Sequence, residues 1–365
     1  MKTFPLRSDL TSLALTETGA HLSDVTFTLP GGRKVSPTHT APWADEPMPD
    51  DTPPMLRVLR GDFLCAPFGD SDVIPTETRP HGGTANGTWR LDRQTATGLE
   101  ATLEGDVMGA SVSLHLELRP GENMVYQRHS FTGGKGRLPI GHHAMLRADQ
   151  PLELGFAPWT WAGTPPEPIE VPPAGRSVLA YPQEIADLRV VRRTGGGTAD
   201  ITHYPFDDGH EDVLMLVADR AAPFAWTAAT CAEAGWVWFA LKNPRELPAT
   251  TLWLSNGGRT YAPWSSRHRR VIGLEEICGY FHLGHAASIG DNPLAARGTP
   301  TAITLGAPLS ISYAFGLAPV PSGFGAVATI VPAEHSIRLI DGAGRQAVAA
   351  CDLSFITGTS PEHSQ

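Results

Sequence analysis

The fold class is decided by the stretch SVSLHLELRP, residues 111–120. Val112, Leu114 and Leu116 alternate with Ser113 and His115. Successive side chains of a β-strand point to opposite faces, so this pattern is typical of a strand with one buried face. The same pattern places His115 on the solvated face, where we expect no functional role.

Similar short strand patterns recur along the chain, for example in DVTFTLPGG, GLEATLEG and TTLWLSNGG. Turn sequences such as Pro-Gly-Gly at 30–32 separate them. No convincing amphipathic helix of about twelve residues or more is present. We therefore predict an all-β fold of mostly antiparallel strands with few short helices, arranged as a sandwich or closed double sheet.

Two proline-rich stretches, residues 37–55 and 157–176, are the candidate linkers. Both contain tryptophan, which favours loops packed on the body of the protein over free tethers. We expect Trp43, Trp159 and Trp161 to serve in packing more than in stacking on a sugar. We predict one domain over residues 1–365; whether 157–176 caps a cleft or forms an interface stays open.

The composition narrows the possible partners. The formal net charge is −10, which disfavours nucleic-acid binding, and only 18% of residues are charged. No apolar run reaches the roughly 18 residues of a membrane span, and the N-terminus lacks the apolar core of a signal peptide. The four cysteines form no CxxC pair, so a structural zinc site is not expected. We predict a reduced cytoplasmic protein, monomer or homodimer, without a membrane partner.

Residues 255–285 combine basic, acidic and aromatic side chains, and the chain contains 14 histidines. A metal site is one hypothesis, although Gly284 weakens the helical pairing that His282 and His285 would need. A histidine and carboxylate cup assembled from distant strands stays open. The second hypothesis is general acid–base catalysis by an imidazole and a carboxylate that face each other across a small substrate.

Five sequence blocks are similar to the aldose 1-epimerase or galactose mutarotase-like superfamily, in the same order and at similar spacing. LRGDFLCAPFGDSD and RPHGGTANGTWRL resemble its hexose-6-phosphate 1-epimerase branch, through Arg60, His81 and Asn86 among others. LPIGHHAML resembles the block with the family histidine, HEDVLML the start of an acidic strand, and VIGLEE the strand of the catalytic glutamate. The blocks cover residues 56–281, and the resemblance implies a β-supersandwich.

The resemblance also implies residue roles. Glu275 would take the proton of the anomeric hydroxyl and His143 would protonate the ring oxygen, without metal or cofactor. His81, Arg60, Asp212 and Asn86 would bind a sugar, the expected small-molecule partner. Asp207, Asp208 and Glu211 stay open as alternatives to Asp212. His142 and His143 point to opposite faces of one strand, so only one can face the cleft.

The sequence also departs from the family. Ala85 stands where the family has an arginine, so a cation is missing unless Arg57, Arg259 or Arg267 replaces it. The basic residues from 267 to 270 either tune Glu275 or simply solvate their segment, and we favour solvation. Two alternatives to an anomer-interconverting enzyme stay open: a carbohydrate-binding protein without catalysis, and a metal-dependent enzyme that acts on a sugar derivative.

Overall fold

The computed structural model describes residues 1–70, 72–73 and 79–358. The predicted domain of residues 1–365 therefore ends in a segment, 359–365, that lies outside the described residues. Antiparallel strands dominate, and none of the described helices exceeds six residues, which confirms the all-β prediction. No described helix is long and apolar enough to cross a membrane.

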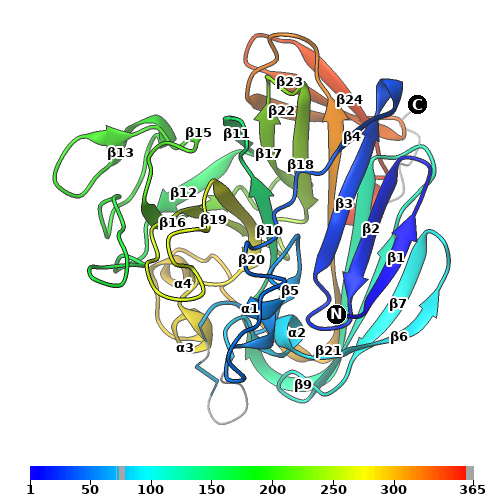
Figure 1. The fold of residues 1–365 in the computed structure, drawn as a ribbon, viewed down its shortest axis with the longest axis horizontal. Coiled ribbons are helices and arrows are strands. Elements are labelled where there is room, and N and C mark those ends of the chain that lie inside the picture. Colours follow the sequence, from blue (N-terminus) through cyan, green and yellow to red (C-terminus); the bar gives the residue numbers. More distant parts are fainter. Residues whose placement is uncertain (71, 74–78, 359–365) are drawn as a thin grey trace.

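Two large antiparallel sheets form the centre of the molecule (Figure 1). The nine-stranded sheet has the order β15-β11-β17-β18-β21-β9-β8-β7-β6. Its strands are β6 (Trp89–Gln94), β7 (Gly98–Leu103), β8 (Ala110–Glu117), β9 (Met124–Leu138), β11 (Leu152–Phe156), β15 (His203–Tyr204), β17 (Ala225–Cys231), β18 (Trp236–Lys242) and β21 (Ile303–Pro319). The six-stranded sheet has the order β12-β16-β19-β20-β10-β5. Its strands are β5 (Leu64–Cys65), β10 (Ile140–Arg147), β12 (Trp159–Gly163), β16 (His210–Ala218), β19 (Ala249–Asn256) and β20 (Val271–Cys278).

Smaller elements surround the two large sheets. The N-terminal sheet, blue at the right of Figure 1, contains β1 (Thr3–Arg7), β2 (Thr11–Thr16), β3 (Leu22–Leu29) and β4 (Arg33–Val35). The remaining strands are the pair β13 (Val191–Arg192) and β14 (Thr198–Ala199), and the sheet of β22 (Val327–Ala333), β23 (Ser336–Asp341) and β24 (Gln346–Ala350). The helices are η1 (Pro30–Gly32), η2 (Leu188–Val190), α1 (Pro54–Arg57), α2 (Gly82–Asn86), α3 (Gly284–Ile289), α4 (Pro293–Ala296) and α5 (Ser354–Thr357).

The alternation predicted at residues 111–118 is present in β8. Val112, Leu114 and Leu116 are buried in the main core, while His115 is partly exposed beside Glu100 and Glu117. Burial of one face of a strand is what the period of two residues requires. His115 therefore lies on the solvated side, as expected.

The two faces of the six-stranded sheet meet different surroundings. Ile272 and Leu274 of β20 join the core cluster that also holds Trp238 and Phe315 of the nine-stranded sheet. Ile277, three residues further on, belongs to a separate apolar cluster on the opposite face. The site described below is built on that second face.

The interior between the sheets also holds charged side chains. His142 Nδ1 lies within hydrogen-bond distance of Asp62 Oδ2, at 3.2 Å, and Lys242 forms an ion pair with Glu276. All four side chains are essentially buried. His142 precedes His143 by one residue and Glu276 follows Glu275 by one residue. Because successive side chains of a strand point to opposite faces, His142 and Glu276 face the interior.

Candidate functional site

The site centres on His143 and Glu275, which are brought together by strand register. β10 and β20 pair antiparallel with His143 directly opposite Glu275. Side chains of directly opposed residues are neighbours on one face of a sheet. His143 Nε2 lies 3.3 Å from Glu275 Oε1, and both side chains are about 95% buried. A separation of 132 residues in sequence becomes contact within hydrogen-bond reach.

Aromatic rings fix the orientation of His143. Phe63 is stacked on its imidazole, with ring centroids 4.9 Å apart and planes at 14°. Trp253 meets the imidazole edge-on at 5.5 Å. Because Phe63 is fully buried, the ring of His143 has little freedom to turn away from Glu275.

His81 joins the pair from the start of α2. Its backbone is left-handed, with φ of 61°, and its ring contacts His143 edge-on at 5.0 Å. The following Gly82 has φ of +72°, and a Cβ there would lie 2.2 Å from the carbonyl oxygen of Ala66. Only glycine fits this approach, so the His-Gly-Gly sequence is what turns His81 toward the site.

A cavity of about 320 Å³ opens above these three residues. Polar groups converge on it from several loops, while Trp253 and Trp264 supply aromatic wall. The lining comprises Met55, Leu56, Leu59, Gly69, Asp70, Pro80, His81, His143, Ile169, Val213, Thr251, Trp253, Arg259, Tyr261, Trp264, Glu275 and His282. An apolar pocket with a few convergent polar groups is typical of a small-molecule site.

Burial shifts the protonation of the central pair in opposite directions. Removal from water raises the pKa of Glu275 to about 8, opposed by the positive charge of Arg259. The same removal lowers the pKa of His143 to about 3. Both groups are therefore neutral at pH 7, and the carboxyl of Glu275 can donate to Nε2 of His143. Shifts of this kind are common at functional sites.

Arg259 is the cation of the cavity, and the sequence named it only as one of three substitutes for the missing arginine. Its Nε donates to Glu170 Oε1 at 2.8 Å, and its guanidinium carbon lies 4.4 Å from the ring centroid of Trp264. Glu211 Oε1 is 3.7 Å away. Burial raises the pKa of Glu211 to about 7, again opposed by Arg259.

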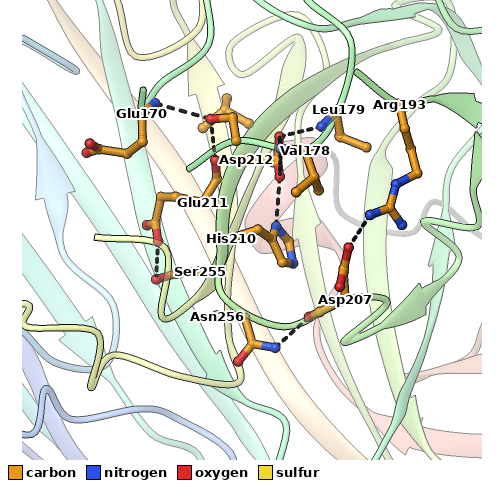
Figure 2. A network of polar contacts seen from close by, with 12 residues as sticks. Glu170, Val178, Leu179, Arg193, Asp207, His210, Glu211, Asp212, Ser255 and Asn256 are labelled. Atoms are coloured by element: carbon orange, nitrogen blue, oxygen red, sulfur yellow. Dashed lines mark hydrogen bonds and ion pairs between the residues drawn. The ribbon is translucent and has the colours of Figure 1, made fainter. Parts of the chain in front are cut away.

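Asp212 does not line the cavity. Its carboxylate accepts hydrogen bonds from the backbone N–H groups of Val178 and Leu179, from the Tyr181 hydroxyl, and contacts His210 Nδ1 at 2.7 Å. Figure 2 shows Asp212 beside Val178, Leu179 and His210, with neighbouring Glu211 pointing the other way toward Ser255. Three of its partners belong to the loop that follows β12 and the fourth is His210 of β16, so the contacts of Asp212 hold that loop against the sheet.

Arg60 and Asn86 also lie outside the cavity lining. Arg60 donates through Nε to the carbonyl of Val58 at 3.0 Å. Asn86 accepts from the backbone of Met55 and donates to the carbonyls of Pro80 and Gly82, each at about 3 Å. Asn86 thereby fixes the turn that carries His81. Of the six predicted site residues, the structure brings together Glu275, His143 and His81.

The basic segment from 267 to 270 has two kinds of residue. Arg267, Arg269 and Arg270 are exposed, as expected, and Arg267 pairs with Glu46. His268, in contrast, is buried and stacked on Trp253 with ring centroids 5.1 Å apart. Among the residues that the structure describes, histidine, cysteine and carboxylate side chains form no group of three that could hold a metal ion.

No protein-family model and no curated protein matches this sequence. Its fold, however, is similar to solved structures. A candidate aldose 1-epimerase from Escherichia coli K12 superposes with a TM-score of 0.57 at 12% identity, covering 87% of this chain and 98% of that one. A galactose mutarotase related enzyme from Lactobacillus acidophilus gives 0.55 at 10% identity, with 87% and 97% covered.

A galactose mutarotase-like protein from Lactobacillus casei gives a TM-score of 0.54 at 13% identity, with 87% of this chain and all of that chain covered. Identities this low describe architecture and carry no information on activity. The two packed sheets and nearly complete coverage agree with the expected supersandwich. The chain therefore has the fold of the aldose 1-epimerase and galactose mutarotase-like proteins.

Proposed function

We propose that this protein binds an aldose in the cavity above β10 and β20 and interconverts its anomers by general acid–base catalysis. The observation that carries the proposal is the contact between His143 and Glu275, 3.3 Å apart on the floor of that cavity. The cavity, at about 320 Å³, is at the small end of the range for ligand sites, which suits a monosaccharide. The aromatic wall offers flat apolar faces to a sugar ring.

The pair contains one transferable proton. At neutral pH this proton resides on Glu275, whose pKa is raised, while His143 is neutral. Transfer across the 3.3 Å contact gives a carboxylate and an imidazolium, which are the base and the acid that ring opening needs.

The two proton transfers of ring opening then balance between His143 and Glu275, and no other group is needed. The imidazolium of His143 gives its Nε2 proton to the ring oxygen, and the bond from that oxygen to the anomeric carbon breaks. Glu275 takes the proton of the anomeric hydroxyl, so the open-chain aldehyde forms and the pair returns to its neutral form. The carbonyl rotates, and the reverse transfers close the ring on its other face. No net proton leaves the site.

The experiment is anomer exchange measured by NMR saturation transfer over free and phosphorylated aldoses, with the spontaneous rate subtracted. We expect exchange in the wild type and at least a 100-fold loss in Glu275→Gln and His143→Asn, the size of a general acid–base contribution. Glu46→Gln, which alters an exposed carboxylate outside the cavity, is the matched control and should keep full rate. Unchanged exchange in both cavity variants would reject the assignment of these residues.

A carbohydrate-binding protein without turnover is the second candidate function. The cavity and its aromatic wall serve binding as well as catalysis. Saturable sugar binding by the wild type, with exchange no faster than the spontaneous rate, would favour it.

A further inference from the structure

Arg259 occupies the cavity wall with most of its side chain out of water. It follows β19, and its side chain is 15% exposed. One face of the guanidinium lies over Trp264, and Trp253 is 5.6 Å from it. A planar cation stacked on aromatic rings has a fixed plane, so the directions of its N–H groups are also fixed.

Only one of the three guanidinium nitrogens of Arg259 is engaged by hydrogen bonding. Nε donates to Glu170, whereas Nη1 and Nη2 have no hydrogen-bond acceptor within the described part of the chain. Glu211, the nearest other carboxylate, approaches Nε at 3.7 Å. Up to four N–H groups are therefore left to the cavity, where a bound molecule must supply the acceptors.

The proline-rich stretch 157–176 provides the brace for Arg259. Glu170 is itself held in place, because its backbone N–H donates to Ser177 Oγ at 3.1 Å. Glu170 Oε1 also accepts from the Tyr261 hydroxyl at 2.9 Å, and Thr260 Oγ1 donates to the carbonyl of Ala174 at 2.8 Å. Ile169 lines the cavity directly. The stretch thus contributes Ile169 to the cavity wall and holds Nε of Arg259 through Glu170.

We propose that Arg259 is a substrate-binding residue that holds sugar oxygens over His143 and Glu275 through Nη1 and Nη2, and that Glu170 is its positioning residue. The inference rests on the proposed sugar-binding function. It assigns the cation that is missing at Ala85, and that Arg60 does not supply, to the connection between β19 and β20. The opposing view is that Arg259 only ties two loops together.

The test compares Arg259→Met, Arg259→Lys and Glu170→Gln with Arg267→Met, an exposed arginine of the same connection. Binding of D-glucose, D-galactose, D-mannose and D-glucose 6-phosphate is followed by the fluorescence of the cavity tryptophans, together with kcat and KM for exchange. We expect Arg259→Met to bind the preferred sugar 10- to 100-fold more weakly, the loss for hydrogen bonds to a charged group. Arg267→Met should bind as the wild type does.

Two further readouts separate a binding role from a structural one. Arg259 opposes the raised pKa of Glu275, so Arg259→Met should move the high-pH limb of exchange to higher pH. Arg259→Lys keeps the charge but not the fork, so it should raise KM and leave that limb in place. Glu170→Gln should raise KM several-fold while kcat changes little.

The outcomes distinguish this inference from the proposed function. Sugar binding that depends on Arg259, without exchange in the wild type, would support the inference and reject the activity. If exchange is lost only in the His143 and Glu275 variants, and Arg259→Met binds the sugar as tightly as the wild type does, the inference alone is overturned. A wild type that binds none of the four sugars would overturn both.

Discussion

Replacing Glu275 by glutamine should raise the free energy of unfolding above that of the wild type, and this difference should grow as pH rises. The folded wild type keeps the proton of Glu275 up to a pKa of about 8, whereas the unfolded chain releases it near the ordinary value of 4.5. Because the folded state binds one more proton, its stability falls by about 1.4 kcal/mol per pH unit between these values. This contribution is complete below pH 4.5 and is lost as pH rises through about 8.

The cleanest window lies between pH 6.5 and 8. His143 has its own linkage of opposite sign, because its pKa falls from 6.5 to about 3 on folding, but that linkage is complete above pH 6.5. Across the window, the stability of Glu275→Gln should therefore gain about 2 kcal/mol relative to the wild type. Glutamine is nearly the same shape, so packing in the cavity floor changes little.

The assay is equilibrium urea unfolding of both proteins at half-unit pH steps. Gln346→Ala, which replaces an exposed non-ionisable residue of β24, should run parallel to the wild type and measures the scatter. A difference between Glu275→Gln and the wild type that stays constant from pH 6.5 to 8 would refute the inference that Glu275 is held protonated.

Other substitutions test the remaining parts of the site. Exchange by the wild type should fall as pH rises above about 8, since the pair then loses its transferable proton; a rate that rises through pH 8, after correction for the spontaneous reaction, would exclude the shared-proton scheme. Phe63→Ala should cost about 3–5 kcal/mol in urea unfolding and also slow exchange, since it removes the ring under His143; unaltered exchange would show that the stack does not orient the imidazole. Asp212→Ala should cost about 3 kcal/mol and speed proteolysis near residue 178, yet leave sugar affinity within a few-fold; a large affinity loss in folded protein would return Asp212 to the binding site. Lys242→Met alone should destabilise by about 3–5 kcal/mol, and the double variant Lys242→Met with Glu276→Leu should recover most of it, as measured by urea unfolding; equal losses would mean that the pair is not coupled.

The sequence by itself determined the fold class. A period of two residues in 111–118 requires a half-buried strand, and it needs no tertiary information because it follows from the geometry of an extended chain. The same period separated His142 from His143 correctly. Five short blocks sufficed to recognise the architecture, and the His-Gly-Gly turn that carries His81 is local, since a left-handed glycine is a property of one backbone position.

Only the tertiary structure decided which polar side chains meet. Glu211 and Asp212 are adjacent in sequence, but their side chains have different partners. Glu211 contacts Trp253 and Ser255, whereas Asp212 accepts hydrogen bonds from the loop backbone. The sequence alone does not distinguish Arg60 from Arg259 as a cation for the site. In the structure, Arg60 donates to the carbonyl of Val58 in its own segment, whereas Arg259 lines the cavity. Long-range register and loop packing fix these choices, because the hydrogen-bond partners that consume or free a side chain come from distant parts of the chain.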